Sequence, residues 1–166
     1  MQCEMRVGIG FDVHRFAAGR RLMLGGVHIP YPQGLEGHSD ADVLIHALVD
    51  ALLGAVGAGD IGSHFPDSNP DYSGIDSAEI LAHTAGVLVR RNAKIIWIDA
   101  VVIAEAPRVL PYVPAMRKRI GEILSMDSSR ISIKGKTTEG LGFTGRKEGI
   151  AVQVAATVAV HPPETE

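Results

Sequence analysis

Residues 150–160 read IAVQVAATVAV, a run of apolar or small side chains that only Gln153 and Thr157 interrupt. Side chains alternate between the two faces of a strand, so a strand with one wet face should alternate apolar and polar residues. This run instead predicts a strand that is covered on both faces. Helices of the same chain can cover one face, and copies of the same sheet can cover the other. We therefore expect a homo-oligomer.

The remaining segments predict an α+β fold, with a mixed β-sheet and helices on one face, in a single domain spanning residues 1–166. Alternating or apolar runs predict strands, and apolar residues at helical spacing predict helices. Ser39 is the expected N-cap of the first helix, with Asp42 three residues further on. The expected strands are 5–11, 94–105 and 130–134, with a hairpin at 21–29 that turns at Gly25-Gly26. The expected helices are 40–56, 76–91 and 111–124, and the expected loops are 30–38, 57–74 and 135–149.

Composition excludes several classes of protein. The chain has 16 Lys and Arg against 19 Asp and Glu and no basic cluster, which argues against a nucleic-acid partner. No apolar run reaches the roughly 18 residues that a bilayer span needs, so we expect no membrane partner. Cys3 is the single cysteine and the N-terminus lacks the apolar core of a secretory signal. We expect a bacterial cytoplasmic protein.

The most specific chemical prediction from the sequence is a metal site. Asp12 and His14 lie two residues apart on the first expected strand, so their side chains share a face. On the first helix, His46 belongs to a polar stripe with Ser39, Asp42 and Asp50, at three- and four-residue steps. Asp12, His14 and His46 form a set that zinc accepts, with a fourth position open. The alternative is a chance Asp-x-His pair and a hydrogen-bonded structural histidine on the helix.

Residues 134–149, KGKTTEGLGFTGRKEG, concentrate hydrogen-bond donors and glycines, which suits an anion such as phosphate. Glu139 stands among these donors, and a divalent cation that bridges it to phosphates would explain its presence. The alternative is a glycine-rich turn with solvated charges. His38 and Ser39, at the expected start of the first helix, predict a second anion site.

Five motifs, in this order, resemble those of the 2-C-methyl-D-erythritol 2,4-cyclodiphosphate synthase family of the non-mevalonate isoprenoid pathway. They span the chain from the first strand to the last. The motifs are GFDVHRF (10–16), GHSDADVLIHALVDALLGA (37–55), GDIGSHFPD (59–67), AEAPRVLP (104–111) and KTTEGLGFTGRKEGIA (136–151).

The resemblance implies roles for individual residues. Asp12, His14 and His46 match zinc ligands, and Glu139 matches the residue that holds a second divalent ion, Mg²⁺ or Mn²⁺. His38 matches a position that stabilises the transition state, as does Thr137. The implied substrate-binding residues are Ser39, Asp60, Ile61, Gly62, Phe65, Pro66 and Asp67 around the methylerythritol part; Ala104, Pro107, Arg108, Val109 and Leu110 in a cytidine pocket from a neighbouring subunit; and Lys136, Thr138, Phe143 and Arg146 near the phosphates.

The resemblance also implies an activity and an assembly. The family is a homotrimer with its sheets packed around a three-fold axis, and it converts 4-diphosphocytidyl-2-C-methyl-D-erythritol 2-phosphate to the cyclic diphosphate with release of CMP. Phe143 and Arg146 match residues at a central cavity that could take an isoprenoid diphosphate, although Gln153 stands where Glu is common. Two alternatives remain: a zinc-dependent phosphohydrolase, and a non-catalytic trimer that binds isoprenoid diphosphates.

Overall fold

The computed structural model describes residues 3–66 and 68–162. They form a five-stranded sheet in the order β4-β1-β7-β5-β6 and a two-stranded sheet, β2-β3. The strands are β1 (Glu4–Ala18), β2 (Leu22–Leu24), β3 (Val27–Ile29), β4 (Gln33–Leu35), β5 (Ala93–Ile103), β6 (Ile131–Lys136) and β7 (Gly149–Val160). The helices are α1 (Val43–Ala55), α2 (Ile61–His64), α3 (Ser77–Arg90), α4 (Val113–Leu124) and α5 (Gly142–Gly145), with 3-10 turns η1 (Pro70–Tyr72), η2 (Leu110–Tyr112) and η3 (Ser128–Arg130).

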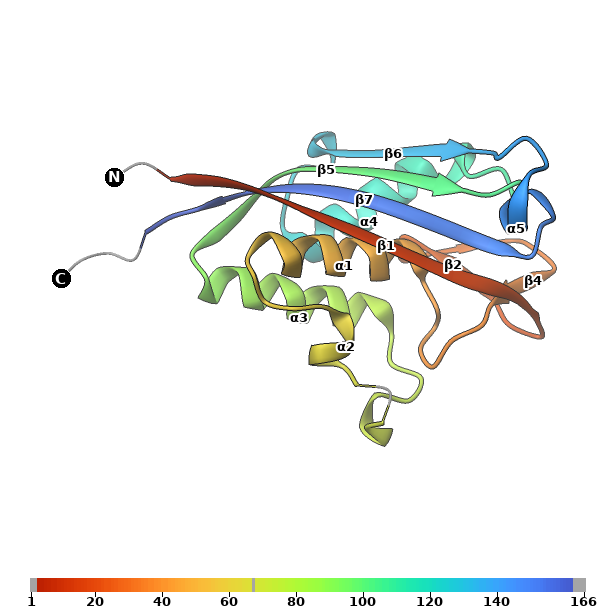
Figure 1. Ribbon diagram of the computed structural model, residues 1–166, viewed down its shortest axis with the longest axis horizontal. Helices are drawn as coiled ribbons and strands as arrows, with labels where there is room; N and C mark the ends of the chain where they lie inside the picture. The colour runs from red at the N-terminus through yellow and green to blue at the C-terminus, as the bar shows by residue number, and fades with distance from the viewer. Residues whose placement is uncertain (1–2, 67, 163–166) are drawn as a thin grey trace.

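The large sheet is mixed, and its helices lie on one side (Figure 1). Strand β7 runs antiparallel to both β1 and β5, whereas β5 and β6 are parallel. The inward side chains of β7 and β5 join those of α1, α3 and α4 in one buried cluster. The predicted α+β class, with a mixed sheet and helices on one face, is therefore confirmed.

Helix α1 lies unusually close to β1, because two glycines of the strand remove the side chains that would separate them. A Cβ at Gly8 would stand 1.8 Å from the carbonyl oxygen of Ala51, and one at Gly10 would stand 1.8 Å from that of Ala47. Real Cβ atoms do not approach backbone so closely, so only glycine fits at either position. This close packing brings His46, a polar residue of α1, next to β1.

The opposite face of β1 is apolar and open in the single chain. Met5, Val7, Ile9 and Phe11 point away from the helices and keep 54%, 65%, 67% and 57% of their surface exposed. Strand β7 adds small side chains beside them, because Ile9 pairs with Ala155. A contiguous apolar surface of this kind is uncommon on a monomer and is typical of an interface. Among the residues that the structure describes, no helix is long and apolar enough to cross a membrane.

Two of the predicted boundaries are wrong. Strand β1 does not end at Phe11 but continues to Ala18, because its polar residues face the helix side while apolar ones stay on the outer face. Helix α1 begins at Val43, and its N-cap is Asp42, whose Oδ1 accepts from the backbone N–H of Ile45 at 3.0 Å. Ser39 is not the cap, because Ala41 has a φ of 57° and interrupts any helix before Asp42.

Three predicted loops contain short regular elements. Strand β4 lies in 30–38, α2 and η1 lie in 57–74, and α5 lies in the glycine-rich segment 134–149, whose first residues already belong to β6. Each element is only three or four residues long, too short for a hydrophobic period to reveal it. The predicted hairpin is confirmed, and Gly25 and Gly26 have φ values of 61° and 72° at its turn.

Candidate metal centre and substrate cavity

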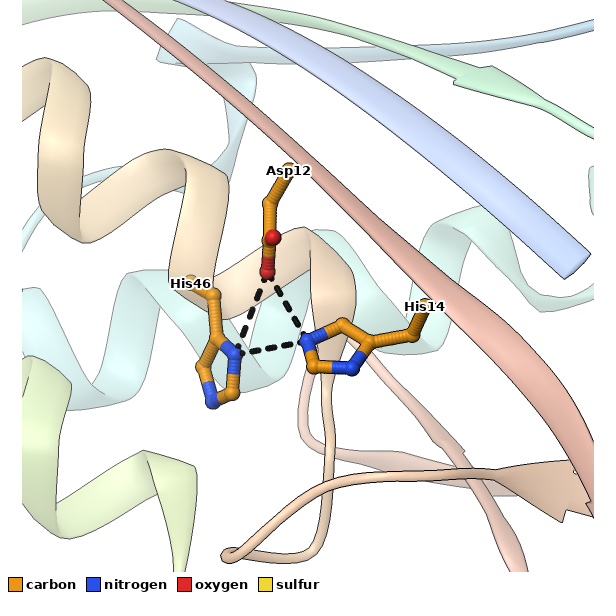
Figure 2. A group of neighbouring side chains, drawn as sticks. All are labelled: Asp12, His14 and His46. Atoms are coloured by element: carbon orange, nitrogen blue, oxygen red, sulfur yellow. Dashed lines mark hydrogen bonds and ion pairs between the residues drawn. The ribbon is translucent and has the colours of Figure 1, made fainter. Parts of the chain in front are cut away.

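Asp12, His14 and His46 point toward one position between β1 and α1 (Figure 2). Oδ2 of Asp12 lies 2.9 Å from Nε2 of His14 and 3.3 Å from Nδ1 of His46, and the two nitrogens are 3.1 Å apart. The three ligand atoms all lie within 4.8 Å of one another. The predicted convergence of the strand pair with the helix histidine is confirmed, and a cation can bind there.

In each imidazole, the ring nitrogen that does not face Asp12 makes a hydrogen bond that fixes the ring. Nδ1 of His14 lies 2.6 Å from the carbonyl oxygen of Glu36, which can only accept, so Nδ1 carries the proton and Nε2 presents its lone pair. Nε2 of His46 lies 3.0 Å from Oγ of Ser77 and 3.2 Å from Oγ of Ser39. Two imidazole nitrogens and a carboxylate oxygen therefore meet, a donor set that fits zinc and leaves a position open for a substrate.

The pKa shifts of this cluster describe its attraction for positive charge. Burial opposes ionisation of Asp12, but hydrogen bonds to His14 and His46 outweigh it and lower the pKa of Asp12 below its usual range. Burial also favours neutral His14, but the hydrogen bond to Asp12 and the charge of Asp12, together with the carbonyl of Glu36 and the charge of Asp42, outweigh it and raise the pKa of His14. Both shifts have the same physical cause, the attraction between the Asp12 carboxylate and positive charge on the neighbouring imidazoles.

A cavity of about 510 Å³ opens beside these ligands. Its wall includes five further residues from the predicted site: His38, Ser39, Ile61, Gly62 and Phe65. Asp60 does not line it but caps α2, accepting from the backbone N–H of Ser63 at 2.8 Å. Pro66 is exposed outside the wall, and Asp67 lies outside the described residues.

Sequence reasoning misplaced one residue of the polar stripe and undervalued another. Asp42 faces away from the cavity, because its carboxylate accepts from the backbone N–H groups of Gly25 and Gly26 and is fully buried. Since Asp42 also caps α1, the anion site expected at the start of that helix is not supported. Asp50 lines the cavity and accepts from the backbone N–H of Ile61 at 2.8 Å, which ties the start of α2 to α1. Burial raises the pKa of Asp50.

The sequence and the fold resemble those of known proteins. The model of the YgbB family matches residues 5–159. The chain belongs to this family. The 2-C-methyl-D-erythritol 2,4-cyclodiphosphate synthase of Geobacillus thermodenitrificans is 54% identical over 149 residues, which cover 90% of this chain and 93% of that protein.

Solved structures give the same result. A chain of the bifunctional IspDF from Campylobacter jejuni has a TM-score of 0.93 and 41% identity; the match covers 96% of this chain but only 43% of that one. The CDP complex of IspF from Plasmodium falciparum has a TM-score of 0.84 and 34% identity, and the match covers 95% of this chain and 97% of that one. Members of the YgbB family are thus related to this chain over nearly its whole length.

The other predicted site residues lie away from this cavity. Among the described residues, its wall takes none from 104–110 or 136–146. Thr137, Glu139 and Arg146 are exposed, and Oγ1 of Thr137 donates to the Glu139 carboxylate at 3.1 Å. Arg146 pairs with Glu148 at 2.7 Å. In the isolated chain, the residues predicted to bind cytidine and phosphate therefore do not share one pocket with the metal ligands.

Two further contacts in this second region were not predicted. Lys134, the first residue of the donor-rich segment 134–149, is paired with Asp99 on the outer sheet face at 2.5 Å. Glu105 accepts from the backbone N–H groups of Thr138 at 3.2 Å and Gly140 at 3.0 Å, and so fixes the glycine-rich segment to the end of β5. No spacing rule signals this contact, since Glu105 and Thr138 lie on different segments.

Proposed function

We propose that this chain is a metal-dependent 2-C-methyl-D-erythritol 2,4-cyclodiphosphate synthase that acts as a homotrimer. Its substrate would be 4-diphosphocytidyl-2-C-methyl-D-erythritol 2-phosphate. The observation that carries the proposal is the coincidence of a zinc-type donor set, facing a cavity, with membership of the YgbB family over residues 5–159.

The reaction needs no nucleophile from the protein. An oxygen of the 2-phosphate attacks the β-phosphorus, the bond from that phosphorus to the bridging oxygen breaks, and CMP leaves with the bridging oxygen. An eight-membered cyclic diphosphate results. The main obstacle is the approach of one anionic phosphate to another, so catalysis requires positioning and positive charge.

The chain's own residues meet these needs in two groups. Asp12, His14 and His46 would hold zinc, and Glu139 would hold Mg²⁺ or Mn²⁺ against the diphosphate. Bound there, the cations would polarise phosphate oxygens and offset their charge. His38 and Thr137 are the proposed donors of hydrogen bonds to the transition state.

The predicted loop 57–74, called the substrate loop here, and the cavity would position the methylerythritol part of the substrate. Ser39, Ile61, Gly62 and Phe65 line the wall beside the metal ligands, where the methylerythritol part would lie. The tie from Asp50 to Ile61 holds the start of this loop at a fixed distance from His46. Asp60, Pro66 and Asp67 are proposed to complete this subsite on the same loop.

The proposed trimer explains why the second group lies elsewhere on the chain. The open apolar face of β1, with Val7 and Ile9 about two-thirds exposed, suits burial against a second copy of the sheet. A neighbouring subunit would then bring its cytidine pocket and phosphate residues to the metal. The proposed residues of that pocket are Ala104, Pro107, Arg108, Val109 and Leu110, with Lys136, Thr138, Phe143 and Arg146 beside the phosphates.

The test combines product analysis with metal analysis. Phosphorus NMR of a reaction with the wild-type chain should show two mutually coupled phosphorus signals of the cyclic diphosphate, together with CMP. Open monophosphates would indicate a zinc-dependent phosphohydrolase instead. Binding of an isoprenoid diphosphate without turnover, unchanged in His46→Ala, would indicate a binding trimer. Zinc content should be close to one per chain in the wild type and lost in His14→Ala.

A further inference from the structure

The proposed metal ligand His46 is connected to the half-buried carboxylate of Asp40 through a single hydroxyl. Ser77, the first residue of α3, is fully buried, and its Oγ lies 3.0 Å from Nε2 of His46. The same Oγ donates to Oδ1 of Asp40. Asp40, Ser77 and His46 come from the segment before α1, from α3 and from α1, so the contact joins three separate parts of the chain at the metal centre.

The direction of these hydrogen bonds is fixed by Asp40. An ionised carboxylate only accepts, so the hydroxyl hydrogen of Ser77 is used on Asp40. Ser77 can then only accept from His46, which places a proton on Nε2 of that ring. A neutral imidazole with its proton on Nε2 has its lone pair on Nδ1, the nitrogen that faces Asp12 and His14.

The surroundings of Asp40 suit a negative charge. Its Oδ1 also accepts from the backbone N–H of Ser77 at 3.3 Å, at the N-terminus of a 14-residue helix, where the helix dipole favours an anion. The N–H of Asp42 lies at 3.3 Å from the same oxygen. Ser39 differs from Ser77 because the described contacts of its Oγ, with the N–H of Ala41 at 3.0 Å and with Nε2 of His46 at 3.2 Å, include no carboxylate that would fix the direction of its hydroxyl.

We propose that Ser77 and Asp40 are positioning residues for the metal centre: they select the tautomer of His46 and fix its ring so that Nδ1 binds zinc. Outer contacts of this kind typically change metal affinity by about 10- to 100-fold when removed. The inference rests on the proposed zinc site, and it assigns to the start of α3 a role that neither the cavity wall nor the predicted site residues include.

The test measures the zinc dissociation constant of the metal-free, full-length protein by competition with a chromophoric chelator. Ser77→Ala should weaken zinc binding by about 10-fold or more. The matched control is Thr84→Val, which removes the other buried hydroxyl of α3; that hydroxyl donates to the carbonyl of Ile80 and does not contact the metal ligands. The control should bind zinc within about two-fold of the wild type.

A second pair of variants separates the effect of the hydrogen bonds that link Asp40, Ser77 and His46, called the relay here, from a general effect on α3. Asp40→Asn keeps an acceptor oxygen but removes the charge that orients the Ser77 hydroxyl. This variant should raise the zinc dissociation constant several-fold. Asp76→Asn removes a charge at the same helix end, where Asp76 caps α3 through the N–H of Ala78, and should leave zinc affinity unchanged. In Ser77→Ala, adding Asp40→Asn should cause little further loss, because the relay is already broken.

A spectroscopic readout tests the geometry directly. The visible absorption of the Co²⁺-loaded protein should change in Ser77→Ala and stay as in the wild type in Thr84→Val. Equal zinc constants and equal Co²⁺ spectra for these two variants would overturn the relay while leaving the zinc site intact. A wild type that binds no zinc would overturn the metal site and the relay together. If Ser77→Ala does not fold, the Asp40→Asn and Asp76→Asn pair decides in the same way.

Discussion

The two halves of the proposed active site differ in how far one chain completes them. The metal half has its three ligand atoms within 4.8 Å of one another, on β1 and α1, with each imidazole held from behind. In the phosphate half, Thr137, Glu139 and Arg146 are exposed; the side chains of Thr137 and Glu139 hydrogen-bond to each other, and Arg146 pairs with Glu148. The folded chain therefore brings the metal half together by itself, whereas we propose that a substrate and a neighbouring subunit complete the phosphate half.

The largest effect should come from separating α1 from β1. Gly10→Ala places a methyl group 1.8 Å from the carbonyl oxygen of Ala47, so the helix must move and the core must loosen. We expect the free energy of unfolding to fall by about 3 kcal/mol or more. Denaturant unfolding of the metal-free protein measures it.

Gly54→Ala, on α1, is the matched glycine-to-alanine control. A Cβ at Gly54 meets nothing within 4 Å, so this change should raise the free energy of unfolding by about 0.5–1 kcal/mol. Similar losses in both variants would mean that the close contact between α1 and β1 contributes no more to stability than an open glycine position does.

Removing a metal ligand should abolish most activity while preserving the fold. His46→Ala takes away one of the two imidazoles, so CMP release should fall on the order of 10²-fold or more. Zinc content should fall in parallel. His28→Ala, which changes an exposed histidine on β3, should keep both at the wild-type level. Full turnover by His46→Ala without bound zinc would remove the metal half from the mechanism.

The metal half could be predicted from sequence because its signals are local. Asp12 and His14 share a strand face through a spacing of two, and His46 is a polar residue in the middle of an aliphatic helix. Their convergence depended on Gly8 and Gly10, whose role as close-approach positions appears only when α1 is seen against β1. How the strand packs against the helix is part of the tertiary structure, and the hydrophobic periodicity of the sequence does not predict it.

Other parts were beyond sequence reasoning for identifiable reasons. The start of α1 was placed too early because Ser39 satisfies the N-cap preference, whereas the positive φ of Ala41 decides the boundary. The contact from Ser77 to His46 joins residues 31 positions apart, and the contact from Glu105 to Thr138 joins residues 33 apart. Hydrogen bonds between distant segments have no signature in one sequence, so these supports were not predicted.

A smaller effect is expected from the phosphate half. Glu139→Gln removes the charge that would bind the second divalent ion but leaves the zinc ligands untouched. We expect zinc content to stay constant while activity falls about 10-fold and requires more Mg²⁺ or Mn²⁺. Titration of activity against each ion measures the shift. A loss of zinc in Glu139→Gln would show that the two halves are not independent.

The last prediction asks whether the two halves of one site come from different chains. Chains carrying His46→Ala and chains carrying Glu139→Gln are each impaired, in the metal half and in the phosphate half respectively. If each site joins the metal half of one subunit to the phosphate half of the next, every mixed trimer contains one junction where both halves are intact. Random mixing of equal amounts should then restore about a quarter of the wild-type sites.

Activity should recover only if subunits of the two variants assemble in the same trimer. A mixture in which the subunits have not exchanged is therefore the control. The two variants should be denatured and refolded together, or produced in the same cells, and compared with a mixture of separately folded trimers, which should stay impaired. Phe11→Asp, which puts a charge on the open apolar face of β1, should prevent assembly and the recovery with it, while zinc binding by the single chain persists. Recovery absent despite proven mixing would mean that one chain supplies both halves, by a movement of residues 104–110 and 136–146 toward the metal.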